Sequence, residues 1–574
     1  MIPATSESSA PIYALLHDSL TDEHELGVVR GALAAARETR ATLLCIPGGG
    51  VEDPAPDCSA KNFVFELARA RGVRGILVLS GAVGNAIGPE RLSAWLTRFQ
   101  SLPICAAGVA LEAYPSVSVD NASGTRAAVL HLLQVHGKRS IAFIRGPVAS
   151  EEAEARLSAY REALTSEGVP VQERWIVQGD YDHASGVQGV RSLLDERKVS
   201  IHSLDGLVAA NDCMALGALE ELRNRGVDVP GQLALVGFDD VQSARVSRPA
   251  LTTVRQPSEQ MGREAFRRLA SMADARASGS LVLPTELIVR ASCGCVETSL
   301  DLARRSEMPS LGLGFEAAFL RQRQLIASEL ARSARGRFGG AGANWESLWI
   351  GALLDELRGR DRGGLVRKVQ QSLRSIERRG GDLSPVQEVL AVLRHQALPC
   401  AGSDPAVREQ LEEILHDAQV AVGAIVAQSA AASARHVSER HRPFRRRMQT
   451  LMFGDVKELS LIAAEELPAV GVEACVVARL RQPDALGRDV EVLFGFGPQG
   501  QRVLPELQSL HSLIAHPVFK NAGSALFALP VTFMDQPLGV AVLSVAAADG
   551  PLHEELREVL STVLKVLSLG PGNG

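Results

Sequence analysis

The sequence predicts an α/β fold in two lobes, followed by an all-helical section and a smaller α+β section. Short apolar runs alternate with segments of helical periodicity from residue 11 to about 295, and this rhythm restarts near residue 140. After Cys295 almost every segment up to Arg440 has helical spacing, and strand-like runs return beyond about residue 444. Alternating strands and helices indicate parallel sheets covered on both faces, and two successive sets indicate two lobes.

Length and composition set the bounds for this prediction. A chain of 574 residues is too long for one hydrophobic core. Hydrophobic residues make up 46% and charged residues 22%, so we expect an ordered globular chain. The net charge of −6 argues against a binder of polyanions along the whole chain and leaves room only for a local basic patch.

The eight cysteines are scattered through the chain, which is typical of a reducing compartment. The start, MIPATSESSAPIY, lacks the basic and apolar regions of a signal peptide. No apolar run reaches the roughly eighteen residues needed to span a bilayer. We therefore expect a cytoplasmic protein.

The first set of strands and helices accounts for one lobe. Strands are predicted at Pro11–Leu16, Thr42–Ile46, Gly75–Leu79 and Pro103–Ala106, with helices at Glu25–Thr39, Asn62–Arg71 and Pro89–Phe99. Two of these strands end abruptly in polar or small residues, His17-Asp18 after the first and Ser80-Gly81 after the third. In open parallel sheets ligands bind beyond the carboxyl ends of the strands, which makes these residues candidates for a binding site.

The second set repeats the pattern. Strands are predicted at Ser140–Ile144, Trp175–Val177, Gly206–Ala209 and Leu233–Val236, with helices at Ala153–Ser166, Ala184–Asp195 and Ala215–Arg225. The last two strands are followed closely by Asn211-Asp212 and Asp239-Asp240. We expect these amides and carboxylates to form the floor of a cleft between the lobes.

Five motifs in order carry a family resemblance. They are VSVDNASGTRAAVLHLLQVHGKRSIAFIRGP (117–147), ARLSAYREAL (155–164), VAANDCMALGALEELRNRGVDVPGQLALVGFDD (208–240), PALTTVRQP (249–257) and LPTELIVRASCGC (283–295). Together they resemble the effector-binding module of the LacI/GalR family over residues 10–295. The resemblance implies a two-lobed periplasmic-binding-protein-like (type I) fold whose chain crosses between the lobes three times.

The resemblance also implies roles for particular residues. Arg156 matches the family's arginine that holds ligand hydroxyls or carboxylates, and a guanidinium fork suits such groups. Asn211 matches an amide that donates to the effector and accepts from it. The expected ligand-binding set is Arg156, Asn211, Asp239, Gln256, His17, Asp18, Ser80 and Asp120.

Plainer interpretations of some of these residues stay open. Asp212 and Asp240 suit the cap of a following helix or turn, and Arg156 suits the surface of a helix. The family's transcriptional members carry a helix-turn-helix ahead of the sensor, whereas only ten residues precede Pro11 here. We therefore expect no DNA binding by the usual route.

The second half is predicted as a helical bundle with a signalling helix over residues 315–440 and an α+β section over residues 444–569. In its layout the latter resembles a GAF domain, with an antiparallel turn expected around Asp535-Gln536-Pro537. The chain has no GG-[DE]-EF string and no nucleotide-binding lobe. The GxGxxG at 495–500 is interpreted as a loop, because Pro498 removes a backbone donor and Lys520 stands where an acidic residue is required.

Two further features receive plain interpretations. The basic segment ARHVSERHRPFRRRM (434–448) fits the solvated face of a helix, with phosphate contact as the alternative. The Cys293-Gly294-Cys295 pair lacks other ligands nearby in sequence, so no metal and no cofactor are expected.

The leading hypothesis is a non-enzymatic, homodimeric sensor. It would bind a sugar-like or nucleoside-like effector and signal to an unknown partner. One alternative is a regulator that contacts DNA through the basic segment or through a partner. The other is an enzyme with an unrecognised site in the C-terminal half.

Overall fold

The chain divides into two compact units, which are described separately. The computed structural model describes residues 10–272, 279–295, 314–334, 338, 342, 344–378, 383, 385–402, 404–423, 425–426, 456–481, 489–498, 501–520, 523–545 and 550–569. The first unit, called the sheet unit, comprises residues 1–288, 292–294 and 440–574. The second, called the helical unit, comprises residues 289–291 and 295–439. Among the described residues, no helix combines the length and apolar character that crossing a bilayer requires.

The first lobe of the sheet unit is built on parallel strands in the order β11-β5-β4-β3-β1-β2. The strands are β1 (Ile12–His17), β2 (Thr42–Pro47), β3 (Val73–Leu79), β4 (Ile104–Ala107), β5 (Ser116–Val119) and β11 (Leu281–Leu283). Because helices cover both faces, the β1 run Ala14, Leu15 and Leu16 is completely buried. Helices α1 (Glu23–Glu38) and α10 (Ser258–Met272) cover one face, and η1 (Asn62–Arg69) and α4 (Gly88–Leu96) cover the other.

The second lobe has the strand order β12-β10-β9-β8-β6-β7. Its strands are β6 (Ile141–Arg145), β7 (Ile176–Gln178), β8 (Gly206–Ala209), β9 (Ala234–Asp239), β10 (Thr252–Arg255) and β12 (Glu286–Ile288). Helices α5 (Asn121–Leu130), α6 (Glu151–Ser166), α7 (His183–Arg191) and α8 (Asp212–Asn224) belong to this lobe. The chain passes between the two sheets after β5, after β10 and between β11 and β12, so the predicted type I pattern of three crossings is confirmed.

The sequence located eight of these twelve strands to within three residues, and β5, β10, β11 and β12 were not assigned. Strand β5 was not assigned, because its four residues SVSV are too short and too polar to read as an apolar run. The helix predicted over Asn62–Arg71 is the 3₁₀ helix η1, which follows a short α-helix, α2 (Pro56–Lys61).

Helices α1 and α10 pack closely on each other, and this contact positions residues at the start of both helices. A Cβ atom at Gly31 would lie 1.9 Å from the carbonyl oxygen of Glu259, and one at Gly262 would lie 2.0 Å from that of Val28. Only glycine permits backbones to approach so closely. As a result the His24 ring lies beside the start of α10, with Nδ1 3.2 Å from the Ser258 hydroxyl.

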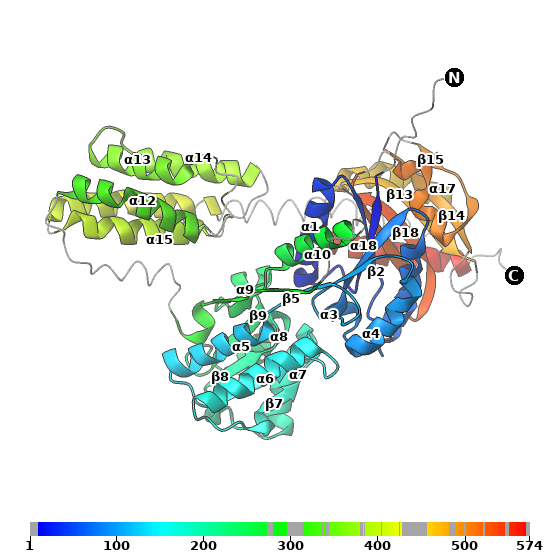
Figure 1. The fold of residues 1–574 in the computed structure, drawn as a ribbon, viewed down its shortest axis with the longest axis horizontal. Helices are drawn as coiled ribbons and strands as arrows, with labels where there is room; N and C mark the ends of the chain where they lie inside the picture. Colours follow the sequence, from blue (N-terminus) through cyan, green and yellow to red (C-terminus); the bar gives the residue numbers. More distant parts are fainter. Residues whose placement is uncertain are drawn as a thin grey trace. The chain divides into compact units, whose positions relative to one another are not determined.

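The C-terminal section continues the sheet of the first lobe. Strand β17 (Ala525–Phe533) pairs in parallel with β2, in the register Ala525↔Leu43, Leu526↔Leu44 and Phe527↔Cys45. Strands β18 (Gln536–Val545), β13 (Val472–Leu480) and β14 (Asp489–Phe496) follow antiparallel (Figure 1). Strands β15 (Arg502–Val503) and β16 (Glu506–Ser509) both pair with β14 and complete a twelve-stranded sheet. Nothing in the sequence pattern indicates this junction.

The two sections share their cores on both faces of the sheet. On one face, Leu15 and Phe266 of the first lobe belong to the same buried cluster as Phe527 and Leu556. On the other face, Phe65 clusters with Leu513. Helix α17 (Val456–Glu466) and the closing helix α18 (Gly550–Leu569) belong to this section. The β17–β18 turn carries Met534 at φ 53°, where the sequence predicts the antiparallel turn.

The helical unit contains α12 (Phe315–Ser333), α13 (Trp345–Leu357), α14 (Gly364–Arg378) and α15 (Val386–Ala397), and residues 405–423 are also helical (Figure 1). These helices enclose one apolar cluster centred on the fully buried Trp349. Its indole Nε1 donates to the Ser372 hydroxyl over 3.1 Å, which satisfies the polar group of this side chain. The basic segment 434–448 and residues 499–500 of the GxGxxG lie outside the described residues.

Candidate functional site: the cleft between the lobes

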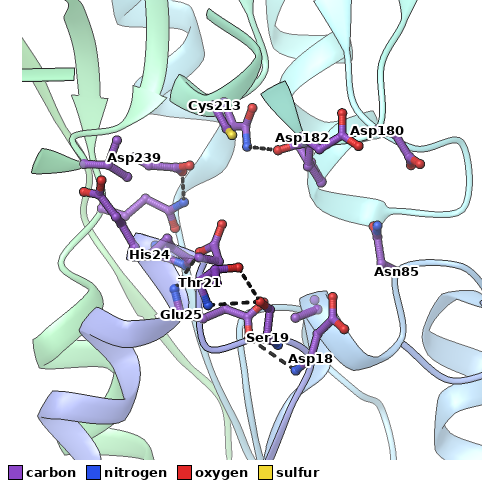
Figure 2. Close-up of a pocket in the computed structure, with 18 of the residues that line it drawn as sticks. Asp18, Ser19, Thr21, His24, Glu25, Asn85, Asp180, Asp182, Cys213 and Asp239 are labelled. Atoms are coloured by element: carbon purple, nitrogen blue, oxygen red, sulfur yellow. Dashed lines mark hydrogen bonds between the residues drawn. The ribbon is translucent and has the colours of Figure 1, made fainter. Parts of the chain in front are cut away.

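A cavity of about 410 Å³ lies between the two lobes of the sheet unit. The first lobe contributes Asp18, Ser19, Thr21, Asp22, Glu23, His24, Glu25, Gly81, Ala82 and Asn85. The second lobe contributes Glu152, Arg156, Asp180, Tyr181, Asp182, Asn211, Cys213, Leu216, Asp239, Val241 and Ser243, and Gln256 lies at a crossing. Figure 2 shows Asp18 and Asn85 facing Asp180 and Asp182 across the open space.

Arg156 lines the cavity and is also part of its wall. Helix α6 carries it inward, so that only 2% of the residue is exposed. Its Nε donates to Asn121 Oδ1 over 2.8 Å and its Nη1 donates to the Ala210 carbonyl over 2.6 Å. The guanidinium also lies over the Phe238 ring, 3.8 Å from the centroid. The surface-helix interpretation is therefore wrong, because this arginine is buried in the second lobe.

Asn211 combines a place in the cavity with a capping role. Its Oδ1 accepts from the Met214 N–H over 2.9 Å and caps α8, while its Nδ2 donates to the Tyr181 carbonyl over 2.8 Å. Both ends of the amide thus have partners within the lobe. The neighbouring Asp212 points away from the ligand space, where it accepts from the Thr253 hydroxyl over 2.6 Å and from the Val241 N–H over 3.1 Å.

Asp239 and Gln256 meet at the base of the cleft. The Gln256 Nε2 donates to Asp239 Oδ1 over 2.6 Å. Asp239 ends β9 with φ 121°, a left-handed conformation that is rare for a residue with a side chain. Burial raises the pKa of Asp239 to about 6, against the lowering effect of the nearby His24 and Arg156 charges. The next residue, Asp240, instead accepts from Arg255 Nε over 2.6 Å and from Arg245 Nη2 over 3.1 Å.

Asp18 and Glu25 form an acidic pair where β1 ends. Burial and the neighbouring Glu25 raise the pKa of Asp18 to about 7. Burial and the charge of Asp22 raise the pKa of Glu25 to about 8, even though its carboxylate accepts from the Asp18 and Ser19 N–H groups over 3.2 Å each. At neutral pH these carboxyl groups can therefore donate as well as accept hydrogen bonds.

Three residues of the expected set do not line the cavity. His17 is fully buried behind Asp18, with Nδ1 3.0 Å from the Ser19 carbonyl oxygen, and burial lowers its pKa to about 4. The Ser80 hydroxyl lies 3.0 Å from the Ala107 carbonyl oxygen and 2.5 Å from that of Val109. Asp120 caps α5 by accepting from the Ser123 N–H over 2.9 Å. Each of these side chains contacts a partner within the protein, although the buried His17 Nε2 has no hydrogen-bond partner among the described residues.

The cavity is more acidic than the sequence-based set of ligand-binding residues predicts. Among the described residues that line it, eight are carboxylic acids, whereas Arg156 is the sole arginine and no lysine is present. Four of the eight come from one segment, DSLTDEHE (18–25). That run of acids at the end of the first strand was the available signal, but only its first residue was assigned a role.

Direct contacts join the lobes at the mouth of the cavity. The Glu23 carboxylate, at the start of α1, accepts from the Gln242 N–H over 2.5 Å and from the Ser243 hydroxyl over 2.6 Å. Gln242 and Ser243 lie in α9 (Gln242–Val246) of the second lobe. These bonds hold the two lobes together on that side.

Comparisons with known proteins agree with this architecture. The family described as periplasmic binding protein-like domain matches residues 129–293. The HTH-type transcriptional regulator CelR of Thermobifida fusca is 40% identical over 187 residues, which is 32% of this chain and 54% of that protein. The HTH-type transcriptional repressor PurR of Yersinia pestis is 32% identical over 209 residues, which is 36% of this chain and 58% of that protein. The chain thus spans little more than half the length of these relatives.

Among solved structures, a CelR–cellobiose complex is 31% identical with a TM-score of 0.43, covering 49% of this chain and 84% of that one. A LacI family regulator from Mycobacterium smegmatis is 24% identical with a TM-score of 0.43, covering 49% and 98%.

Fold and cleft define a class, the two-lobed type I binding proteins. Within that class, the family match and the sequence relatives show that the two lobes are a LacI/GalR effector-binding domain.

Proposed function

We propose that the chain is a regulatory sensor that closes its lobes on a small, neutral, polyhydroxylated effector of sugar type. The observation that carries this proposal is the cavity itself, in which Arg156, Asn211, Asp239 and Gln256 converge with first-lobe residues such as Asp18. Its volume falls within the roughly 300–1,000 Å³ typical of small-molecule sites.

The lining supports a neutral polyol over an anion. A phosphate or carboxylate would meet eight acidic side chains and one arginine, and like charges in a partly buried site repel strongly. Sugar hydroxyls both donate and accept, so they can bond to carboxylates and to protonated carboxyl groups alike. The nucleoside-like alternative has less support, because Tyr181 is the sole phenylalanine, tyrosine or tryptophan among the described lining residues.

Asn85 offers the clearest vacant contact. Its Oδ1 is buried at the cavity wall and has no hydrogen-bond partner among the described residues. A buried acceptor without a partner costs about 1–3 kcal/mol, which a ligand hydroxyl would recover.

The test is a thermal-shift screen on the full chain with neutral sugars, amino sugars, sugar phosphates and nucleosides. Cellobiose, the sugar named with the CelR structure, belongs in the first arm. A ligand at a hundred times its dissociation constant should stabilise the protein by about 2.7 kcal/mol. We expect this shift with a neutral sugar and none with its phosphate.

A matched pair of variants locates the site. Asn85→Ala should weaken the ligand-induced shift without lowering the melting temperature of the unliganded protein, because the Oδ1 has no partner to lose. Asn224→Ala, an exposed position at the end of α8, should change neither. A sugar phosphate that binds as tightly as its parent sugar, or an unchanged shift in Asn85→Ala, would refute the proposed chemistry.

The signal is proposed to pass from the lobes to the C-terminal section, which we take as a GAF-like module in a homodimer. The pairing of β17 with β2 supports this route, because movement of the first-lobe sheet is carried directly into the neighbouring strands. Hydrogen exchange with and without effector tests the idea, and protection that changes in β13 and β18 is the expected result. Multi-angle light scattering measures the oligomeric state.

Control of transcription is a second candidate. It is supported by the relatives CelR and PurR, which are described as HTH-type regulators. Binding of the full chain to genomic DNA fragments should then weaken with added salt and respond to the effector. Loss of binding in Arg445→Ala, Arg446→Ala, Arg447→Ala would assign the contact to the basic segment, and no binding at physiological salt would reject this candidate.

A further inference from the structure

Four potential metal ligands gather at the end of the second lobe, apart from the effector cavity. The ligand atoms of His131, His136, Cys293 and Cys295 all lie within 4.8 Å of one another. None of these residues lines the cavity. The sequence-based expectation that the Cys293-Cys295 pair lacks further ligands is corrected here, because the two histidines come from a much earlier part of the chain.

Two of these separations match the geometry around a tetrahedral metal ion. With metal–nitrogen bonds of about 2.05 Å and metal–sulfur bonds of about 2.3 Å, tetrahedral geometry places two nitrogens about 3.3 Å apart and a nitrogen and a sulfur about 3.5 Å apart. In the structure the Nε2 atoms of His131 and His136 are 3.2 Å apart, and Cys293 Sγ is 3.5 Å from His131 Nε2. The imidazole rings meet edge to face at 78°, with their centroids 4.9 Å apart.

An irregular helical turn brings the two histidines together. Residues five apart on an α-helix point about 140° away from each other, so His131 and His136 would diverge on a regular helix. Here α5 ends at Leu130 and continues as a π-helical turn, His131–Val135, with His136 at its end. A π turn is closed by hydrogen bonds between residues five apart, and such turns are often found at functional sites.

Hydrogen bonds to the second-lobe sheet hold the cysteine segment in place. Ser292 donates its N–H to the Ala250 carbonyl over 3.0 Å, and its hydroxyl donates to the Leu235 carbonyl over 2.6 Å and accepts from the Thr252 N–H over 2.8 Å. Cys293 is consequently buried, with 1% of the residue exposed. Gly294 then turns the chain at φ 102°, and a Cβ there would touch the His136 ring at 3.5 Å.

We propose that these residues form a structural zinc site of the Cys₂His₂ type. Two thiolates neutralise the charge of a divalent ion, and an N₂S₂ donor set in tetrahedral array is characteristic of zinc. Cys293 and both histidines belong to the sheet unit, and Cys295 follows two residues later. The metal would fasten the last residues of the effector-binding domain to the end of α5, at the point where the chain leaves the second lobe.

The competing interpretation is a hydrogen-bonded histidine pair beside two thiols, which binds no metal. Elemental analysis of the full chain, purified without a histidine tag or chelator, separates the two. We expect about one zinc per chain. Replacement by Co²⁺ should give a thiolate-to-metal charge-transfer band in the near ultraviolet, together with the visible bands of tetrahedral cobalt.

Single substitutions identify the ligands. Cys295→Ser and His136→Ala, both at half-buried positions, should each lose the stoichiometric metal and weaken the cobalt charge-transfer band. Cys58→Ser and His183→Ala, which lie elsewhere, should retain both. Because a bound metal stabilises only the folded state, a strong chelator should lower the melting temperature of the wild type and leave that of Cys295→Ser unchanged.

Failure of this site is distinguishable from failure of the effector proposal, because metal content and cobalt spectra require no effector. A chain without stoichiometric metal whose apo form gives no thiolate band with Co²⁺ overturns the inference. So does full retention of metal in Cys295→Ser. Where His136→Ala fails to fold, the cobalt titration of the wild type still decides the question.

Discussion

Single residues at the cleft stabilise the fold and also line the proposed effector site. Arg156 lines the cavity and also donates hydrogen bonds to Asn121 and to the Ala210 carbonyl. Asn211 lines the cavity and also caps α8. Such double use makes the cleft rigid before the ligand arrives, which reduces the ordering cost of binding. It also means that substitutions here test stability and affinity at once.

Arg156→Ala should therefore be costly in the unliganded protein. Removal of the guanidinium leaves the buried Ala210 carbonyl and the Asn121 amide without donors, at about 1–3 kcal/mol for each group. Urea unfolding should show this loss, and the effector-induced thermal shift should disappear. Arg161→Ala on the same helix, whose side chain makes a surface pair with Glu173, should cost less than about 1 kcal/mol. Equal stability of the two variants would contradict the structural role of Arg156.

The acidic pair at the end of β1 predicts a pH dependence. Burial raises the pKa of Glu25 from 4.5 to about 8 and that of Asp18 from 3.8 to about 7. The folded state then binds these protons more tightly than the unfolded state, so the free energy of unfolding falls as pH rises from about 4 to 8. His17 acts in the opposite sense, because its pKa falls from 6.5 to about 4, but only below pH 6.5.

Between pH 6.5 and 8 the carboxyl effect should appear alone. We expect the unfolding free energy to fall by about 2 kcal/mol over this interval. Glu25→Gln should flatten the slope, since it removes one titrating group and relieves its repulsion of Asp18. Chemical denaturation at several pH values measures this, with Glu66→Gln as a surface control that keeps the wild-type slope. Parallel curves for Glu25→Gln and the wild type would show that Glu25 does not titrate in this range.

At the scale of elements, the start of α1 carries both the acidic lining and the contact between the lobes. Asp22 caps the helix by accepting from the Glu25 N–H over 2.8 Å, which directs Glu23 across the mouth toward α9. Helix α10 locks α1 in this position through the glycine contacts described above. The position of Glu23 at the mouth of the cavity is thus fixed by two first-lobe helices that pack closely on each other.

Loss of the Glu23 contact should favour the open form. Glu23→Gln removes a charge-assisted interaction with Gln242 and Ser243, worth roughly a three- to tenfold change in affinity. We expect faster effector dissociation with little change in the association rate, measured by stopped flow. Glu38→Gln, at the other end of α1 and paired with Arg267 on α10, is the matched control. Slower dissociation in Glu23→Gln would contradict a closing role.

On the scale of the whole molecule, the twelve-stranded sheet joins the C-terminal section to the first lobe. An edge strand such as β2 exposes backbone groups that invite unwanted pairing, and β17 covers this edge. Cores shared on both faces make the junction apolar as well as hydrogen-bonded. The helical unit has its own core around Trp349 and should unfold separately.

Calorimetry can test this division. Phe527→Ala empties a buried site on β17 and should destabilise the sheet unit by about 3–5 kcal/mol, in the same transition that the effector stabilises. Trp349→Ala should lower a different transition, one that does not respond to effector. An effector-responsive transition that is untouched by Phe527→Ala would show that the C-terminal section unfolds independently of the lobes.

The sequence by itself determined the two-lobed fold, because periodicity and strand ends are local properties. Strands that are buried on both faces must be apolar, so their positions can be predicted from hydrophobicity. The family motifs assigned Arg156, Asn211, Asp239 and Gln256 to one site, and all four line the cavity. His17, Ser80 and Asp120 also follow strands, but local spacing could not reveal that each turns to a nearer backbone or side-chain partner.

Only the tertiary structure decided which distant segments meet. The β2–β17 pairing joins strands from opposite ends of the chain, and the histidines that follow α5 meet the Cys293 segment, which lies 162 residues after His131. Sequence periodicity does not predict such long-range contacts, because they depend on which apolar faces and which metal-binding atoms are adjacent in the folded chain. The acidic cavity likewise depends on the tertiary structure, because its acidic residues come from both lobes and lie far apart in the sequence.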